Sequence, residues 1–439
     1  MKGIAVERDN AAASDRRTAM RAAAPWLPLL LFLVTTTAAD EDRHAVHGVA
    51  RTLWLGAKPV AVVEEKIDGD VIHRHLDLPS AWGSDRSVLE VKRGKDGDLQ
   101  YAHYQRRGPR GGRDVAIEIV SGRGTLRTPH GTFVLPGERP VVLLDLLGHE
   151  RPASPVEVTF LDLPSGEYLP GKLLVSPSGR ETLALDLAGH EIAAAIYQAS
   201  ARRGPGAFSE VKQGSHGLYR GDAPLHPPLP AAPGAYAALR LVAEGAVPWS
   251  SMALDGPGQS LIEAPNVVAC RPQYADIRPP EPQHLAAAPF LEVDHPDVVE
   301  FARRVGRREN GLAAALLLAE AVHGNLDFDD GGGPPSAVLA LERQAGDCDD
   351  AAALVVAALR ATGHPARPVV GYRHLGGVLV PHAWAEVYSD GRWHPVDATL
   401  PGVGPFESHL RLFEGLGSPF TMGRVLGALR VVPVDRADL

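Results

Sequence analysis

The sequence predicts an α+β protein, in which an antiparallel β-rich region is followed by a region of helices and paired strands. Short stretches rich in Val, Ile and Leu recur between residues 45 and 222, and clusters of Gly, Pro, Asp and Asn separate them. After residue 290, stretches with helical spacing come first and stretches with strand spacing follow. These two patterns divide the chain into a β-rich domain and an α+β domain.

The first 39 residues have the pattern of an export segment. Arginines precede an apolar run at residues 22–34, and a series of small residues follows it. The run is short for a membrane-spanning helix, which needs roughly 20 apolar residues. The pattern predicts a signal peptide or N-terminal anchor at 1–39. We therefore expect an exported protein, periplasmic or secreted, with residues 22–39 as the segment that would anchor it in a membrane.

Residues 40–222 are the predicted β-rich domain. Regular short strands with turn residues between them are typical of an antiparallel sandwich or barrel. No catalytic constellation stands out in this domain, so we expect it to bind the substrate or a partner in the cell envelope. Residues 223–289 are predicted to be a Pro-rich connector with a few strands. The clearest strand patterns lie at 59–65, 87–93, 115–120, 140–147, 156–161 and 182–187.

Residues 290–439 form the predicted α+β domain. The last predicted helix is closed by Gly363, and glycine commonly follows the final helical turn. The strands after this helix are short and alternate apolar with polar residues. Helices are expected at 295–307, 311–323, 336–344 and 347–362, and strands at 366–372, 382–388 and 392–399.

Composition excludes several classes of protein. The 439 residues carry a net charge of -9, which gives no electrostatic support for binding a nucleic acid. The two cysteines, Cys270 and Cys348, are too few for a disulfide scaffold or a Cys-rich zinc site. We expect no metal and no cofactor. One disulfide, two inert thiols or a reactive thiol all remain open.

Cys348 lies in the first turn of the last predicted helix. Asp347 is suited to cap this helix, because its side chain can accept hydrogen bonds from the unpaired N–H groups. The positive end of the helix dipole favours a thiolate here, and the same N–H groups can stabilise an oxyanion. Asp347, Asp349 and Asp350 bring negative charge, which is expected to raise the pKa of the thiol. A thiolate at Cys348 would therefore need a positively charged histidine partner.

His382 and Asp397 are predicted to share one face of a β-hairpin. A turn signal at residues 389–391 separates the two strands. A two-residue loop places Trp384 opposite Asp397, and a four-residue loop places His382 there instead. Both registers keep His382 within hydrogen-bonding reach of the carboxylate. Glu386 is on the same face and is expected to be a surface or cleft-rim charge.

The side chains of Cys348, His382 and Asp397 have complementary chemistry. A thiol can attack a carbonyl, an imidazole can take its proton and return it, and a carboxylate can orient the imidazole and stabilise its cation. The three residues could act as a triad if the helix start meets the hairpin. Sequence spacing alone does not show that the two meet.

Residues 346–399 resemble bacterial members of the transglutaminase-like superfamily, a branch of the papain-like folds. The resemblance covers about residues 290–400 and does not extend to 45–270. It implies that the helix start meets the hairpin, with Cys348 as nucleophile, His382 as base and Asp397 as the residue that orients the base. The stretches that carry it are Gly-Asp-Cys at 346–348, Leu-Arg-Ala-Thr-Gly-His-Pro-Ala-Arg at 359–367, His-Ala-Trp-Ala-Glu-Val at 382–387 and Trp-His-Pro-Val-Asp-Ala-Thr at 393–399.

Two features differ from the animal transglutaminases. Those enzymes have a Trp directly after the nucleophile and another upstream, whereas here Asp349 follows Cys348 and no Trp lies between Trp249 and Cys348. The resemblance therefore does not imply protein crosslinking. By similarity to the Gln of papain-like enzymes, Gln344 is a candidate oxyanion donor, and Trp384 is a candidate wall of the substrate pocket.

The resemblance implies a cysteine-dependent acyl transferase or hydrolase that attacks amide or ester carbonyls of a protein or peptide through an acyl-thioester. Two alternatives remain open. One is a periplasmic or secreted cysteine peptidase or deamidase that uses only water as acceptor. The other is a non-catalytic scaffold that keeps the fold for binding. A disulfide between Cys270 and Cys348 would block the nucleophile.

Overall fold

A computed structural model gives the structure of the chain. It describes residues 51–435 apart from gaps, and the expected export segment at 1–39 lies outside the described residues. No helix in this described part has the length and apolar character that crossing a bilayer requires. The largest gaps are 107–112, 146–153, 175–181, 199–210, 329–334 and 417–428.

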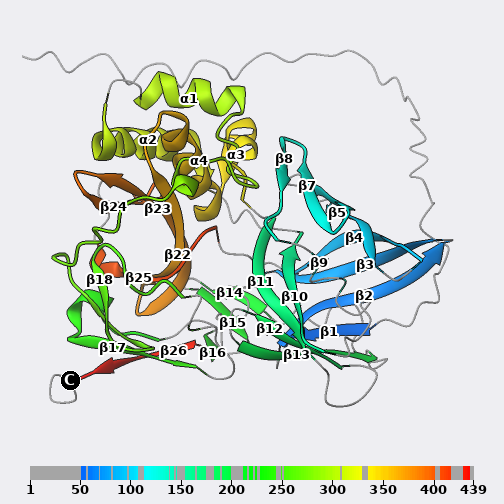
Figure 1. Ribbon diagram of the computed structural model, residues 1–439. Coiled ribbons are helices and arrows are strands. Elements are labelled where there is room, and N and C mark those ends of the chain that lie inside the picture. The colour runs from blue at the N-terminus through cyan, green and yellow to red at the C-terminus, as the bar shows by residue number, and fades with distance from the viewer. Residues whose placement is uncertain are drawn as a thin grey trace, which may run out of the picture. The chain divides into compact units, whose positions relative to one another are not determined.

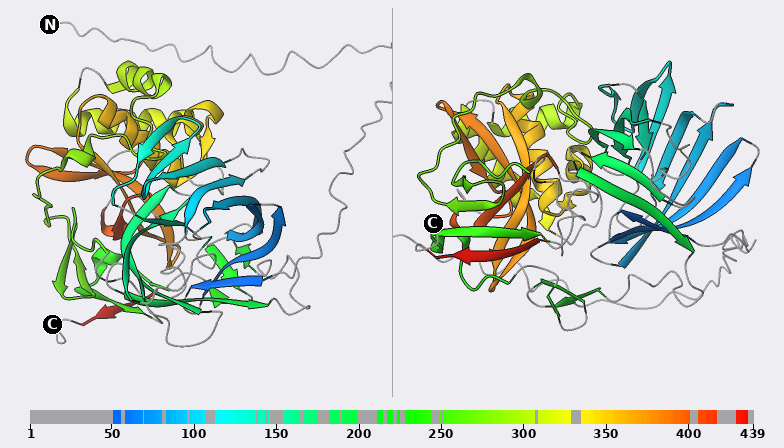
Figure 2. Two further views of the ribbon diagram at one scale, coloured as in Figure 1. Left: turned by 45° about the vertical axis from the view of Figure 1, so that its right-hand side comes forward. Right: turned by 60° about the horizontal axis from the view of Figure 1, so that its bottom comes forward.

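The N-terminal region is one continuous sheet of 13 strands in the order β8-β7-β6-β5-β4-β3-β2-β1-β13-β12-β11-β10-β9 (Figure 1). Neighbouring strands are antiparallel except β9 and β10, which are parallel. Figure 2 shows the long strands β2 to β5 side by side. The strands are β1 (Arg51–Leu55), β2 (Lys58–Asp68), β3 (Val71–Ser80), β4 (Gly83–Arg93), β5 (Leu99–Arg106), β6 (Arg113–Val120), β7 (Arg123–Thr128), β8 (Gly131–Val134), β9 (Pro140–Val142), β10 (Val156–Asp162), β11 (Glu167–Leu174), β12 (Thr182–Leu187) and β13 (His190–Gln198).

Alternation along these strands builds a core on one face of the sheet. Ala102 and Tyr104 of β5 are buried together with Val115 and Ile117 of β6 and Leu126 of β7. Side chains two residues apart in a strand point to the same face, so this spacing follows from the pleat. The β-rich N-terminal region predicted from the sequence is therefore confirmed, whereas the domain boundaries stay a prediction.

The C-terminal region packs helices against a four-stranded antiparallel sheet in the order β24-β23-β22-β25 (Figure 1). Helix α4 is Ala-rich and buried along most of its length, because it lies between the other helices and strands β22 and β23. The predicted α+β class is confirmed. The elements are α1 (Pro296–Gly306), α2 (Gly311–Asn325), α3 (Ala337–Arg343), α4 (Cys348–Ala361), β22 (Ala366–Leu375), β23 (Val378–Ser389), β24 (Arg392–Val396) and β25 (His409–Glu414), with a two-stranded parallel pair β20 (Asp327–Phe328) and β21 (Ala345–Gly346).

The segment between these regions contributes to the C-terminal core. Leu239 and Val268 pack in one hydrophobic cluster with Val370 and Tyr372 of β22. Its strands pair with the last strand of the chain in the order β18-β19-β17-β26. They are β17 (Ala238–Ala243), β18 (Gln259–Glu263), β19 (Val267–Cys270) and β26 (Leu429–Val434), preceded by a small sheet of β14 (Val211–Gly214), β15 (Gly217–Arg220) and β16 (Ala223–Pro224).

Candidate active site

Helix α4 begins with a capping arrangement that fixes Cys348 at its first position. The carboxylate of Asp347 accepts hydrogen bonds from the backbone N–H groups of Asp349 and Asp350, at 2.9 and 3.3 Å. The carboxylate of Asp350 accepts one in return from the N–H of Asp347, at 3.4 Å. This reciprocal cap uses the orphan N–H groups of the first turn. The predicted N-cap role of Asp347 is therefore confirmed.

The thiol of Cys348 is half-buried and is held in its neutral form. Burial raises the pKa of Cys348 well above its usual value, and the carboxylates of Asp349 and Asp347 raise it further. The backbone N–H of Ala383 acts in the opposite direction and is outweighed. The thiol donates to Oδ1 of Asp349 at 3.6 Å. Burial, followed by the neighbouring carboxylates, therefore keeps the thiol protonated.

Cys270 forms no disulfide with Cys348. Both cysteines are free thiols, so the disulfide that would have blocked the nucleophile is absent. Burial raises the pKa of Cys270 to about 12, and its Sγ lies 3.8 Å from Oε1 of Gln259. Cys270 is therefore an inert core thiol.

The β23–β24 hairpin has the two-residue loop of the two registers considered. Ser389 pairs with Arg392, and Ala385 pairs with Val396. Asp397 follows directly after β24, on the face that His382 shares. Nε2 of His382 lies 2.8 Å from Oδ2 of Asp397, and both side chains are buried. The hydrogen bond expected from the hairpin is therefore present.

The carboxylate of Asp397 accepts four hydrogen bonds. Oδ1 accepts from the N–H and the hydroxyl of Thr399, at 2.9 and 2.7 Å. Oδ2 accepts from Nε2 of His382 and from Nε2 of His409, the second at 3.2 Å. Burial alone would raise the pKa of Asp397, but the two imidazoles hold it well below its usual range. An ionised Oδ2 can only accept, so both imidazoles carry a hydrogen on Nε2.

This arrangement leaves Nδ1 of His382 as the nitrogen with the basic lone pair. Burial lowers the pKa of His382, and it outweighs the attraction of Asp397 for the imidazolium. His382 is therefore neutral at rest and can take up a proton at Nδ1. The next residue along the strand, Ala383, directs its N–H at the thiol of Cys348, so the helix start and the strand meet.

Two aromatic contacts complete the surroundings of His382. The ring of Trp384 is stacked with that of His382 at a centroid distance of 6.3 Å and meets the ring of His409 edge-on at 5.0 Å. Sequence reasoning missed His409, the first residue of β25. Strand β22 separates β25 from β23, and no local pattern specifies which strand the last one joins. Alternation in His409-Leu410-Arg411-Leu412 marks a strand but does not identify a partner for the histidine.

The structure brings some of the expected site residues together and leaves others apart. Among the described residues, the thiol of Cys348 contacts the carboxylate of Asp349 and the backbone N–H of Ala383. The imidazole of His382 lies within hydrogen-bonding distance of Asp397 and Thr399, and no direct bond between this imidazole and the Cys348 thiol is found among these contacts. Gln344 is exposed and forms the left-handed C-cap of α3. Its N–H bonds the carbonyl of Ala340, and its oxyanion role stays a prediction, like the catalytic roles of the triad.

The expectation for Glu386 was wrong. Its side chain is fully buried and is not at the surface or at a cleft rim. It accepts hydrogen bonds from Arg367 at 2.7 Å and from Arg411 at 3.2 Å. Two guanidinium groups compensate for the burial of the carboxylate, so it serves as a structural anchor between β22, β23 and β25.

Comparison with known proteins assigns the C-terminal region to a family. Residues 299–398 match the sequence model of the transglutaminase-like superfamily. No curated protein sequence matches the chain. Among solved structures, a candidate cysteine protease from Cytophaga hutchinsonii is 23% identical over 35% of this chain and 50% of its own, with a TM-score of 0.29.

The periplasmic domain of TgpA from Pseudomonas aeruginosa is also 23% identical, over 30% of this chain and 52% of its own, with a TM-score of 0.25. The chain thus spans about half the length of each of these two proteins. The family match at 299–398 contains Cys348, His382 and Asp397, the residues whose surroundings are described above. The C-terminal region of this chain is a transglutaminase-like superfamily domain.

Proposed function

We propose that this chain is an exported cysteine-dependent enzyme that attacks an amide or ester carbonyl of a protein or peptide. Sγ of Cys348 forms an acyl-thioester, and water or an amine then resolves it. The hydrogen bond between His382 and Asp397 is the main support, because it leaves the basic nitrogen of His382 available on the strand that meets the thiol. The β-rich region would hold the substrate or a partner in the cell envelope.

The proton path follows from the charge states. Thiol and imidazole are both neutral at rest, so Nδ1 of His382 takes the proton as Sγ attacks the carbonyl carbon. Asp397 stabilises the imidazolium that forms. The imidazolium then gives its proton to the leaving nitrogen or oxygen, the bond to it breaks, and the thioester remains. The backbone N–H of Cys348, which the cap formed by Asp347 and Asp350 does not engage, can stabilise the developing oxyanion.

Substitution of the thiol tests the nucleophile. A thiol-reactive acyl probe should label the wild-type chain, and Cys348→Ala should abolish both the labelling and the turnover of peptide esters. Asp397→Asn should lower the rate of acylation by about 100-fold or more, because it weakens the orientation and charge stabilisation of His382. Cys270→Ala is the matched control and should leave labelling unchanged. Full activity of the Cys348→Ala chain would refute the proposal.

The acceptor distinguishes acyl transfer from hydrolysis. Incubation of a Gln-containing protein with a labelled primary amine should give amine incorporation if the enzyme is a transferase. Ammonia release or chain cleavage without incorporation would identify a deamidase or peptidase.

Sequencing the N-terminus of the protein recovered from the periplasm or medium tests export and shows whether residues 1–39 are removed.

One observation favours a second candidate, a non-catalytic scaffold. The thiol of Cys348 is directed to Asp349, and its pKa is raised. A scaffold would retain that unreactive thiol in the presence of every substrate. An enzyme should instead be labelled at Cys348 faster by a peptidyl acyl probe than by a small alkylating agent of equal intrinsic reactivity.

A further inference from the structure

Three atoms that commonly bind metal ions converge beside Asp397. One possible ligand atom from each of His382, His409 and Asp397 lies within 4.8 Å of the other two. Nε2 of His382 and Nε2 of His409 are 2.8 and 3.2 Å from Oδ2 of Asp397. The side chains of His382, His409 and Asp397 are only 7%, 8% and 4% exposed. The surrounding side chains therefore already hold the cluster together.

The spacing suits a zinc ion. Bonds of about 2.0–2.2 Å to nitrogen and oxygen put two ligands of a tetrahedral zinc roughly 3.3 Å apart. The distances from Oδ2 to the two nitrogens lie close to that value, so small shifts would admit the ion. Two imidazoles and one carboxylate leave one position of a tetrahedral ion open. The half-buried hydroxyl of Thr399 lies 3.5 Å from Nε2 of His382. We propose that His382, Asp397 and His409 form an inhibitory site for Zn²⁺ or a similar transition-metal ion.

Surrounding groups already orient the proposed ligands. Thr399 holds the other oxygen of Asp397 through its N–H and its hydroxyl. Nδ1 of His409 lies 3.1 Å from the hydroxyl of Ser408. A metal-bound neutral imidazole carries its hydrogen on the other nitrogen, and a serine hydroxyl can accept from that nitrogen as well as donate to it. Outer contacts of this kind fix the ring and strengthen metal binding.

Metal binding would prevent catalysis because it changes the tautomer of His382. A metal at Nε2 needs the lone pair of that nitrogen, so the neutral ring must carry its hydrogen on Nδ1. Nδ1 could then no longer take the proton of the Cys348 thiol. Metal binding itself depends only on the cluster. The inhibitory effect rests on the proposed function, in which His382 is the base.

Metal binding is tested by a titration that requires no enzymatic activity, in the full chain carrying Cys348→Ala. Co²⁺ is the probe, because its visible absorption reports coordination by nitrogen and oxygen. We expect one Co²⁺ per chain, no thiolate-to-metal absorption, and displacement by Zn²⁺. Absence of saturable binding would overturn the proposal. Binding that occurs only when Cys348 is present would also overturn it, because the ion would then sit between Asp347, Cys348 and Asp349, the other candidate group.

The third ligand is tested by His409→Gln. The Gln amide can still donate to Asp397 but is a poor ligand, so the Co²⁺ affinity should fall by at least about 10-fold. His394→Gln is the matched control, because Nε2 of His394 bonds the carbonyl of Ser389 at 3.1 Å, away from the cluster. Its affinity should equal that of the parent. Equal affinities for His409→Gln and the parent, with both chains folded by thermal unfolding, would refute the assignment.

The inhibitory effect of the metal is tested in the wild-type chain. Zn²⁺ should slow labelling of Cys348 by a peptidyl acyl probe, and His409→Gln should require at least about 10-fold more Zn²⁺ for the same effect. Labelling that is insensitive to Zn²⁺, in a chain that binds the ion at the cluster, would refute the inhibitory role. A chain that binds Co²⁺ but is never acylated would instead refute the proposed function and leave the metal site standing.

Discussion

At the scale of single residues, Asp349 is the group that most directly opposes ionisation of Cys348. Its carboxylate is 3.6 Å from the thiol and raises the pKa of Cys348, after burial itself. We predict that Asp349→Asn lowers this pKa and speeds alkylation by iodoacetamide at pH 7 by about 3- to 10-fold, since only the thiolate reacts. In the wild-type chain the rate should still be rising at pH 9, because the thiol pKa lies above that value.

Asp297→Asn is the matched control for this measurement. Asp297 is an exposed acidic residue in the first turn of α1, where it has the same relation to its helix but no thiol beside it. Alkylation of Cys348 should be unaffected by this change. Equal alkylation rates for the wild-type chain and Asp349→Asn would show that burial alone sets the thiol pKa.

At the scale of elements, β25, the strand that carries His409, has a bulge at Leu412, opposite Val370 and Gly371 of β22. Gly371 pairs with His382 on one side, and the register with β25 shifts between Val370 and Gly371 on the other. A Cβ atom at Gly371 would lie 2.1 Å from the carbonyl oxygen of Leu410, which is backbone and cannot turn aside. We predict that Gly371→Ala displaces β25 and lowers the free energy of unfolding by about 1–3 kcal/mol.

Urea unfolding measures this effect, and Gly324→Ala provides the control. Gly324 lies in α2, and a Cβ there would meet nothing within 4 Å. Alanine should therefore be neutral there or stabilise the helix by up to about 1 kcal/mol. If Gly371→Ala is as stable as Gly324→Ala, the bulge does not require glycine.

The same elements show how far sequence reasoning reaches. The contact between His382 and Asp397 is local to one hairpin, so the turn signal and the two-residue period were enough to predict it. The start of α4 was predictable because Asp347 caps it within three residues. His409 was not, because only the tertiary fold brings β25 beside β22 and so near Asp397. For Glu386, Arg367 is its direct neighbour across the β22–β23 hairpin, but the second arginine, Arg411, also lies on β25. A charged residue inside an alternating strand is normally read as exposed, and the arginines that neutralise Glu386 lie 19 and 25 residues away in the chain.

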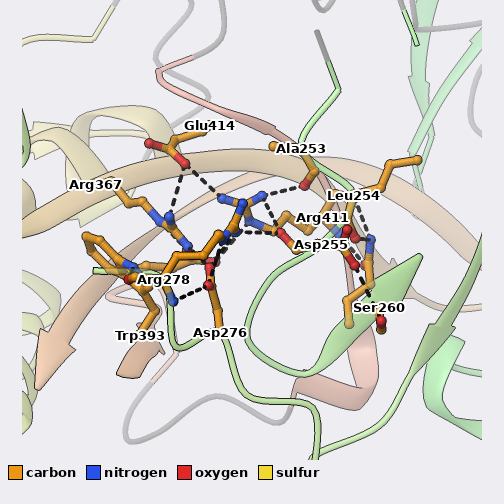
Figure 3. A network of polar contacts seen from close by, with 12 residues as sticks. Ala253, Leu254, Asp255, Ser260, Asp276, Arg278, Arg367, Trp393, Arg411 and Glu414 are labelled. Atoms are coloured by element: carbon orange, nitrogen blue, oxygen red, sulfur yellow. Dashed lines mark hydrogen bonds and ion pairs between the residues drawn. The ribbon is translucent and has the colours of Figure 1, made fainter. Parts of the chain in front are cut away.

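At the scale of the whole molecule, a buried ion network joins the segment around Asp276 to the C-terminal sheet (Figure 3). Asp276 bonds Arg367 of β22 at 2.6 Å, and Arg367 also pairs with Glu414 of β25 at 3.1 Å. The guanidinium of Arg367 lies 3.9 Å from the ring centre of Trp393. The segment predicted as a connector therefore supplies a charge on which the sheet of the candidate site depends.

This network predicts how the protein responds to acid. Burial alone would raise the pKa of Asp276, but Arg278 and Arg367 bring it down to about 2. A carboxylate with a depressed folded-state pKa stabilises the fold above its unfolded pKa, which is 3.8 for an aspartate, and loses that contribution as the pH falls toward 2. Glu414, whose pKa is also lowered to about 2, likewise stabilises the fold above its unfolded pKa of 4.5. It loses that contribution as the pH falls from 4.5 toward 2.

We therefore predict that Asp276→Asn costs roughly 3 kcal/mol of unfolding free energy at pH 7, because it leaves Arg367 short of a buried partner. The variant should also lose less stability than the wild-type chain between pH 5 and pH 2.5. Urea unfolding across that range measures both effects. Asp294→Asn, at an exposed aspartate of the same region, should match the wild-type chain at every pH. If the unfolding free energy of Asp276→Asn falls with pH as that of the wild-type chain does, apolar packing holds the segment around Asp276 to the sheet. The ion pairs of Asp276 would then contribute no net stability.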